Sequence, residues 1–428
     1  MPRSRVSPST DTRAAIATGS RRTSPRPTRL GGRGRLLSLG DQGLSSASNV
    51  LVVLVIARVY PAADFGRFAI AYSVLVLALA LSRAYLGTRL SMTKTAQECR
   101  ELCRTFAGAM LLLAVPLAGV VYLASTILSG GTSGLVWAVT CAAPLVCVQD
   151  LVRFGAIAAD RPLAAFISDL VWFLLMAVVF VVPLQPGPLI LMLWVGAIAA
   201  ALCTGLLVAG MRPVFRGSLK RTLAWDPVAA SIAWGALMAH GSLLAITSLT
   251  AFLLGPPAAA ALRGASTLIG PINVLFGYIN LALTPALLRR PRTADIPLAM
   301  RVAATMVVVA CGWGIALVLL PDAWGHAALG ETWTVTRHIM LITVVEYVGL
   351  SLASGSTLAL KVRRKARVLV WQKAWTAVLS VGLAVVGILV FDDVAGAAAG
   401  LAVAGFAGAA IGWSGLLRTR EGARATAR

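Results

Sequence analysis

Apolar runs of helical length recur along almost the whole chain, and each is long enough to cross a lipid bilayer, which takes about 20 apolar residues. The runs are, in order, Leu36–Ala57, Phe68–Leu86, Thr105–Leu128, Gly134–Ala158, Leu163–Val182, Leu189–Ala209, Ala233–Leu254, Ala265–Leu288, Val302–Leu320, Ile339–Leu360, Val368–Phe391 and Val394–Leu417. Only 13% of the residues are charged and 58% are hydrophobic, whereas soluble domains have about 25% charged residues. The sequence therefore predicts an all-α integral membrane protein with about 12 transmembrane helices.

The basic residues predict the orientation of these helices. With a cytoplasmic N-terminus, 34 of the 38 Lys and Arg residues fall in inner segments. The four in outer segments are Arg58, Arg67, Arg263 and Arg337. Cytoplasmic loops carry an excess of Lys and Arg, so we expect a multi-pass protein of the bacterial plasma (inner) membrane with both termini cytoplasmic. This asymmetry accounts for the net charge of +22 without a nucleic-acid partner.

The hydropathy pattern divides the chain into five parts. Residues 1–35 are basic and rich in Ser, Pro and Gly, which predicts a disordered cytoplasmic tail. Six-helix lobes are expected over 36–210 and 233–417, joined by a cytoplasmic linker over 211–232, with a basic tail over 418–428. The short loops leave no room for a soluble catalytic domain, and no phosphate-binding loop or H-E-x-x-H motif is present. We therefore expect neither an enzyme nor a cofactor or metal site.

A short repeat supports the division into two lobes. Pro61-Ala62-Ala63 with Arg67 recurs 196 residues later as Pro257-Ala258-Ala259 with Arg263. Two halves with an even number of helices share one orientation, which predicts a pseudo-twofold axis along the membrane normal and a cavity between the lobes. Few identities carry this repeat, so chance similarity is the alternative.

The first helix has an unusually polar surface. At about 100° per residue, two adjacent stripes form; their members are Asp41, Ser45 and Ser48, and then Gln42, Ser46 and Asn49. One interpretation is a wet face that lines a cavity. The other is small-residue packing, with Ser hydroxyls bonded to their own helix.

Further ionisable residues lie at the same depth, in the cytoplasmic third of the membrane. They are Arg83, Asp150 (preceded by Gln149), Arg153 and Asp169. In a structural interpretation, Asp150 pairs with Arg153 at i,i+3 and Arg83 pairs with Asp41 or Asp169. In a functional interpretation, Arg83 and Arg153 bind phosphate oxygens, which suit the fork of a guanidinium.

Two carboxylates are candidates for ion coupling, because a desolvated acid can alternate between a proton and a charged partner. They are Asp169 and Glu346. For Glu346 the alternative is a buried side chain bonded to the backbone, and His240 is expected to be a packing residue. The prolines Pro116, Pro144, Pro271 and Pro285 are expected to kink their helices.

Several of these motifs resemble one family. They are Asp41-Gln42 with Ser45-Ser46 and Asn49, Ala57-Arg58, Pro61, Phe65-Gly66, Arg83 with Leu90, Gln149-Asp150-x-x-Arg153, Asp169-x-x-Trp172, Leu262-Arg263 and Gly270-Pro271-x-Asn273. Over Leu36 to Leu417 the chain resembles bacterial polysaccharide and O-antigen flippases. These belong to the multidrug/oligosaccharidyl-lipid/polysaccharide exporter superfamily. This chain is expected to have twelve spans, whereas the lipid II flippase branch has fourteen, which argues against membership of that branch.

The resemblance implies alternating access by two lobes and a polyprenyl-pyrophosphate-linked glycan as cargo, flipped from the inner to the outer leaflet with a coupling ion, H⁺ or Na⁺. It also implies contact with membrane lipids and with a glycan polymerase or other assembly machinery. The residues expected along the path are Asp41, Gln42, Asn49, Arg83, Gln149, Asp150, Arg153 and Asp169. The alternative is a proton- or sodium-coupled exporter of drugs or other small molecules.

Overall fold

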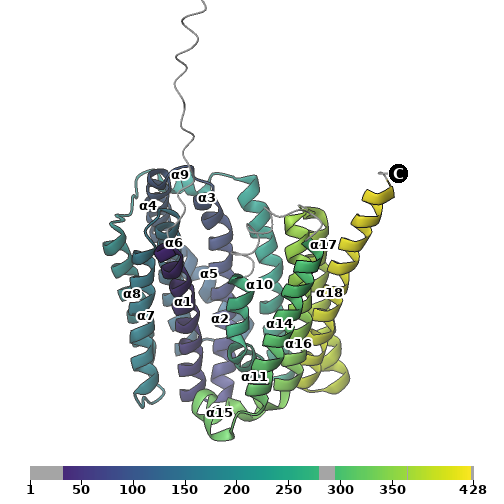
Figure 1. Cartoon of the computed structure of the whole chain (residues 1–428). Coiled ribbons are helices and arrows are strands. Elements are labelled where there is room, and N and C mark those ends of the chain that lie inside the picture. The colour runs from purple at the N-terminus through teal and green to yellow at the C-terminus, as the bar shows by residue number, and fades with distance from the viewer. Residues whose placement is uncertain (1–31, 279–294, 364, 426–428) are drawn as a thin grey trace, which may run out of the picture.

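The computed structural model describes residues 32–278, 295–363 and 365–425, and within these ranges it contains helices and no strand. The helices form two bundles that stand side by side (Figure 1). Among the described residues, ten helices are long and apolar enough to cross a membrane, and the number is 12 if each of two bent helix pairs is one span. The predicted all-α architecture of about twelve spans is therefore confirmed.

The first lobe contains six spans. Its elements are α1 (Gly32–Val59), α2 (Ala62–Ser82) with η2 (Arg83–Gly87) and α3 (Thr88–Ser91), α4 (Ala96–Leu112) with α5 (Ala114–Ser129), α6 (Gly134–Ala158), α7 (Pro162–Val181) and α8 (Pro188–Ala209). The short η2 is a π-helical turn that continues α2. An aromatic cluster fills the core between α2 and α8, where Phe68 contacts both Tyr72 and Trp194.

The second lobe follows a short helix, α9 (Ser218–Leu223). Its elements are α10 (Pro227–Leu254), α11 (Pro256–Leu268) with α12 (Gly270–Tyr278), α14 (Asp295–Val318), α15 (Asp322–Leu329), α16 (Thr332–Val362), α17 (Ala366–Phe391) and α18 (Val394–Ala425). Glycines bring α17 and α18 into backbone contact, because a Cβ on Gly387 would overlap the carbonyl of Gly396.

Proline marks both bends. The α4/α5 pair is bent by 57° and the α11/α12 pair by 54°. Pro116 lies in the first turn of α5 and Pro271 in the first turn of α12. Because proline lacks an N–H and its ring clashes with the preceding turn, a helix bends just before it. Pro144 lies within α6, and Pro285 lies outside the described residues.

Several segment boundaries differ from the predicted ones. Helix α1 begins at Gly32 and not at Leu36, and residues 1–31 lie outside the described residues. The expected linker over 211–232 contains α9 and the start of α10, where Asp226 caps the helix by accepting bonds from Val228 N and Ala229 N. Helix α18 continues to Ala425, through most of the expected C-terminal tail.

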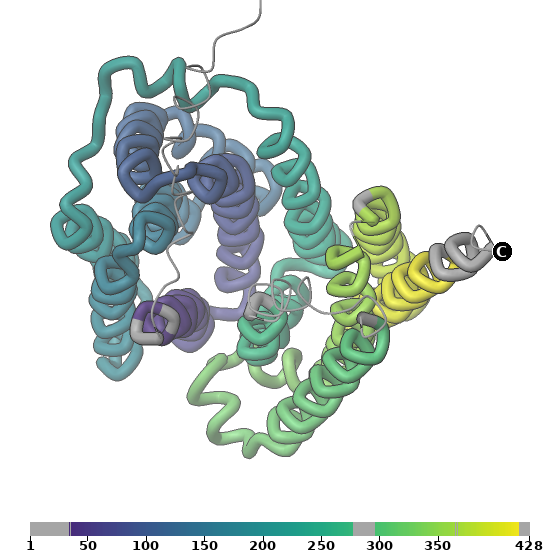
Figure 2. Tube along the Cα trace, turned by 45° about the horizontal axis from the view of Figure 1, so that its top comes forward, coloured from purple at the N-terminus to yellow at the C-terminus, as the bar shows by residue number. Residues whose placement is uncertain are grey.

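We call the two ends of the molecule the α9 face and the α15 face (Figure 1). On the α9 face, first-lobe side chains hold the connection between the lobes. Arg89 donates to the carbonyls of Thr222 and Arg221, and Tyr85 donates to the carbonyl of Ala224. The connection is thus held against the first lobe. Figure 2, which is tilted so that the α9 face comes forward, shows it passing around this lobe.

The lobes approach each other closely near the α15 face. A Cβ on Gly66 of α2 would overlap the carbonyl oxygen of Pro256 at the start of α11. Gly330, with φ of 55°, lies against α1, where an added Cβ would be 2.9 Å from the carbonyl oxygen of Ala57. Any larger residue at Gly66 would therefore force the two lobes apart.

Candidate functional site

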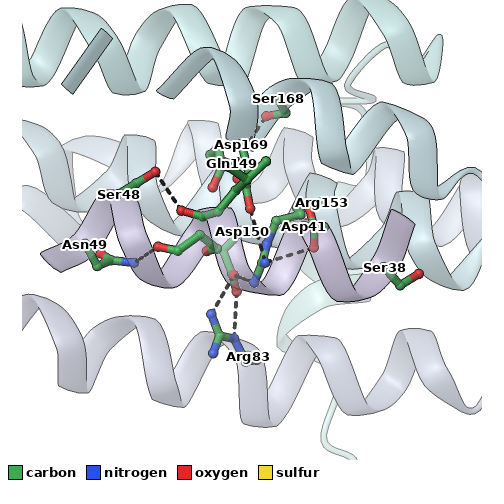
Figure 3. A network of polar contacts seen from close by, with 12 residues as sticks. Ser38, Asp41, Ser48, Asn49, Arg83, Gln149, Asp150, Arg153, Ser168 and Asp169 are labelled. Atoms are coloured by element: carbon green, nitrogen blue, oxygen red, sulfur yellow. Dashed lines mark hydrogen bonds and ion pairs between the residues drawn. The ribbon is translucent and has the colours of Figure 1, made fainter. Parts of the chain in front are cut away.

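An ionic cluster lies inside the first lobe around Arg153 of α6 (Figure 3). Its side chain is 5% exposed. Nη1 lies 3.1 Å from Asp41 Oδ2 and 3.3 Å from Asp169 Oδ2, and Nη2 lies 2.8 Å from Asp150 Oδ1. One guanidinium thereby ties together α1, α6 and α7. We call Asp41, Arg83, Asp150, Arg153 and Asp169 the Arg153 cluster.

Neutral side chains complete the inner side of this cluster. Gln149 Nε2 donates to Asp169 Oδ1 at 2.7 Å and to Ser168 Oγ at 3.2 Å. Ser168 Oγ in turn donates to the carbonyl of Ala201 on α8. Both carboxylate oxygens of Asp169 are therefore engaged by side chains of α6, Gln149 and Arg153.

Arg83 lies at the outer edge of the cluster, on the π-helical turn η2. Its Nε and Nη2 donate to Asp150 Oδ2 and Oδ1 at 3.0 and 2.6 Å, a bidentate pair. The predicted i,i+3 pair of Asp150 and Arg153 is confirmed, but the expected pairing of Arg83 with Asp41 or Asp169 is wrong. Arg83 pairs with Asp150 because α6, which carries Asp150, packs against η2. The Arg83 side chain remains 43% exposed.

The two arginines are thus unequal. The Arg153 side chain is buried, and carboxylates occupy both of its Nη atoms, while its buried Nε has no hydrogen-bond partner. A buried charge separated from its partners is costly, so the expectation that Arg153 binds a phosphate is not supported by this geometry. Three carboxylates face two guanidiniums, so the fully ionised Arg153 cluster has one excess negative charge.

The polar stripes of α1 separate into three environments. Asp41, Ser45 and Ser48 are buried, and Ser48 Oγ donates to the carbonyl of Leu44 in its own helix. Gln42 is exposed. Asn49 alone reaches the cavity between the lobes. The α1 surface therefore serves packing and ion pairing at one level and cavity lining at another.

A cavity of about 580 Å³ lies between the lobes, within the size range of small-molecule sites. Helix α1 contributes to it from the first lobe, and α10, α11, α12, α16, α17 and α18 contribute from the second. Besides Ser and Thr, its polar lining residues are Asn49, His240, Arg263, Asn273, Glu346 and Tyr347. His240 is thus a cavity residue, not the packing residue that was expected.

Arg263 is the basic residue of this lining. Its guanidinium lies 4.7 Å from the ring centroid of Tyr72, whose hydroxyl donates to Asn49 Oδ1 at 2.8 Å. No carboxylate of a described residue lies within ion-pair distance of Arg263, and its buried Nε has no hydrogen-bond partner. The side chain crosses from the second lobe to an aromatic ring of the first.

The position of Arg263 corrects the sequence-based start of its helix. It was assigned to an outer connection, because the apolar run begins only at Ala265. In the structure, Pro256 and Pro257 start α11 and Arg263 is in its second turn. Proline suits the first positions of a helix, where its missing N–H is not needed. The alanines that follow continue the helix to Arg263, but their hydropathy is too low to mark this stretch as part of a span.

The cavity lining also contains Asn273, Glu346 and Tyr347. Asn273 Nδ2 donates to the Tyr347 hydroxyl at 2.9 Å, and the Tyr347 ring stacks on Phe276. Within the described ranges, no hydrogen bond or ion pair involves the Glu346 carboxylate, so the backbone bond that was the alternative for this ion-coupling candidate is not observed. Among the same residues, no group of three His, Cys, Asp or Glu side chains could hold a metal ion.

Solved transporter structures share this architecture. The lipid II flippase MurJ in an inward-closed conformation matches with a TM-score of 0.67 at 9% identity, over 90% of this chain and 87% of that one. An inward-facing multidrug resistance MATE family transporter of the MOP superfamily matches with a TM-score of 0.62 at 12% identity, over 91% and 98%. A MATE structure in the straight conformation gives 0.59 at 13%, over 91% and 95%.

No protein-family model matches the sequence, and no curated protein matches it either. At such low identity the structural likeness concerns the fold and not the cargo. The chain therefore has the two-lobed fold found in a lipid flippase and in multidrug transporters.

Proposed function

We propose that this protein is an alternating-access transporter that flips a polyprenyl-pyrophosphate-linked oligosaccharide across the membrane. The observation that carries the proposal is Arg263, a guanidinium in the cavity between the lobes without a carboxylate partner among the described residues. An ionised group in a membrane interior usually faces a cavity or a partner. A phosphate group is the partner that suits its fork of donors.

The direction of transport follows from the distribution of charge. We propose that the α9 face is cytoplasmic, because basic side chains such as Arg89, Arg104 and Arg212 lie on elements at this face, and cytoplasmic segments are enriched in Lys and Arg. The lobes are closed near the α15 face, where Gly66 contacts Pro256. Cargo would enter from the inner leaflet and leave after this contact opens.

Arg83 is a candidate second phosphate contact. Its bond to Asp150 occupies Nε and Nη2, while nearly half of the side chain remains exposed. Arg153 would then have an indirect role, because it holds Asp150 in place and Asp150 in turn orients Arg83. In this arrangement the other path candidates, Asp41, Gln149 and Asp169, support the first lobe and do not contact the cargo, while Asn49 contacts it in the cavity.

The test is transport by the purified protein in liposomes, with a fluorescent short-chain polyprenyl-pyrophosphate sugar. Arg263→Ala is expected to slow flipping at least about tenfold, because a hydrogen bond to a charged group contributes about 1.5–3 kcal/mol. Arg263→Lys should restore part of the rate. Arg67→Ala, which removes an exposed arginine paired with Asp64, is the control and should leave the rate unchanged. Normal flipping by Arg263→Ala would refute the proposal.

A second function, ion-coupled export of a small organic cation, is favoured by a different observation. The Arg153 cluster has more carboxylates than guanidiniums, and the Glu346 carboxylate lines the cavity. A cationic substrate or a coupling proton could use these acids. In this case Glu346→Gln should abolish proton-driven efflux of a cationic dye from vesicles, while Arg263→Ala should not impair it.

A further inference from the structure

A separate basic pocket lies on the α9 face, outside the cavity and the Arg153 cluster. It has a volume of about 390 Å³ and lies between the start of α4 and the turn that joins α6 to α7. Its polar lining consists of Gln97, Arg100, Glu101, Arg104 and Arg161. The lining therefore has three guanidiniums and one carboxylate, a formal charge of +2.

Two of these arginines are held in place by backbone. Arg104 Nε donates to the carbonyl of Arg212 at 2.8 Å, and Arg161 Nη1 donates to the carbonyl of Ala209 at 2.9 Å. No described carboxylate forms an ion pair with Arg100, Arg104 or Arg161. The single acid, Glu101, accepts a bond from Gln97 at 3.1 Å. The pocket thus presents preorganised donors whose charge is not neutralised within it.

The depth of the pocket points to the lipid headgroups. Arg104 immediately precedes the apolar run that starts at Thr105, and Arg161 immediately precedes α7. Both positions lie where apolar helix gives way to polar chain, which is the level of the headgroups.

The connection beside the pocket also carries large exposed apolar side chains. Val214 N donates to the carbonyl of Arg104, which holds this segment against α4. Phe215 is 51% exposed, Leu219 is 37% exposed and Trp225 is 79% exposed. Tryptophan is enriched at membrane interfaces, so Trp225 suits this position. These side chains place the connection, and the pocket beside it, at the membrane surface. A ligand of the pocket is therefore expected to come from the bilayer.

We propose that this pocket binds the phosphate of an anionic phospholipid in the leaflet at the α9 face. Basic pockets between transmembrane helices on the cytoplasmic side are suited to anionic headgroups. The Gly210 backbone is adjacent to the pocket, since a Cβ there would lie 3.7 Å from both Arg100 Nη2 and Arg161 Nη1. The guanidiniums of Arg100 and Arg161 therefore lie close to the same point, as is required for both to donate to one phosphate.

The test is native mass spectrometry of the full chain, released from nanodiscs that contain phosphatidylglycerol and phosphatidylcholine. The wild type should retain one phosphatidylglycerol in preference to phosphatidylcholine. Arg100→Gln and Arg161→Gln should each lower this retention about fivefold, the effect of about one basic residue near a membrane surface. Lys220→Gln, on the same face but outside the pocket lining, is the matched control and should change retention less than twofold.

Two further measurements distinguish a lipid phosphate from a soluble phosphate and show whether the variants remain folded. Millimolar glycerol phosphate should not displace the lipid; displacement would show a site for a soluble phosphate and overturn the proposal. Equal retention by the wild type and both arginine variants would also overturn it. Arg161 is exposed, so Arg161→Gln is expected to keep its thermal unfolding temperature and to provide the decisive comparison if Arg100→Gln unfolds.

Discussion

Among the described residues, the charged side chains inside the first lobe are paired with one another, whereas those of the second lobe that line the cavity are not. In the first lobe, Arg153 is surrounded by three aspartates, and every charged member of its cluster has a partner of opposite sign. In the second, Arg263 and Glu346 line a cavity and neither forms an ion pair with a described residue. Charges that neutralise one another hold a lobe together, whereas unpaired charges are available to a ligand. We therefore propose that the ion pairs of the Arg153 cluster chiefly stabilise the first lobe, and that the unpaired charges of the second lobe contact the cargo together with Asn49 of the first.

The largest expected effect is the loss of Arg153. Arg153→Met leaves three aspartates in a buried site without their shared counter-ion, and breaking a buried pair in this way costs about 3–5 kcal/mol. Arg263→Met should lower the free energy of unfolding by only about 2 kcal/mol, because it removes a single, partly desolvated cation–π contact with Tyr72. Unfolding in detergent, followed by denaturant titration, measures both. Equal losses would contradict the division between the lobes.

Contact between the lobes should be the next most sensitive feature. Gly66→Val places a side chain against the carbonyl of Pro256, and overpacking of this kind costs about 1–3 kcal/mol. The variant should populate a state that is open at the α15 face. Spin labels on Arg67 and Arg263 would be unsuitable, because both side chains have contacts of their own; labels at Val59 and Trp324 report this separation. An unchanged distance distribution would show that the contact does not hold the lobes closed.

A smaller effect is expected at the edge of the Arg153 cluster. Arg83→Gln removes one partner of Asp150, but Asp150 keeps its 2.8 Å contact with Arg153. Because Arg83 is 43% exposed, solvent screens the pair, and the loss of stability should be about 1 kcal/mol or less. A loss as large as that of Arg153→Met would mean that the outer pair, and not the buried guanidinium, organises the lobe.

The smallest effect concerns pH at the α15 face. Hydrogen bonds from Trp333 Nε1 and from Arg337 lower the pKa of Asp322 from its ordinary value of 3.8. A carboxylate with a lowered pKa stabilises the fold above its ordinary pKa, and this contribution is lost as the pH falls through the lowered value. Fluorescence of the buried Trp333 should therefore change only under strongly acidic conditions. Asp322→Asn should remove that transition; its persistence would assign it to another group.

The sequence was sufficient to predict where the membrane-spanning helices lie, but not which charged side chains on them form ion pairs. The run over Gly134–Ala158 coincides with α6 because its hydropathy changes sharply at both ends. Helical periodicity also placed Asp150 and Arg153 on one face. It could not choose among the three aspartates near Arg83, because depth and helical phase do not reveal which helices are neighbours.

Arg263 shows a second limit of the sequence. Hydropathy placed it outside the membrane, because alanines carry little of the signal that identifies a span. Only the proline pair at Pro256 and Pro257 indicated an earlier helix start. Its proximity to Tyr72, on the other lobe, is a tertiary contact that no local pattern contains.

The most direct test of a phosphate-bearing cargo at Arg263 is photocrosslinking from the cavity wall. The photoreactive residue p-benzoylphenylalanine replaces Ser266, which lines the cavity, or Val120, which is 65% exposed and lies outside the cavity lining. We expect polyprenyl-pyrophosphate-linked sugar to be captured at position 266 and not at position 120, and capture to fall at least about tenfold when Arg263 is also changed to Ala. Equal capture at both positions, or capture at position 266 that is unaffected by Arg263→Ala, would contradict the account.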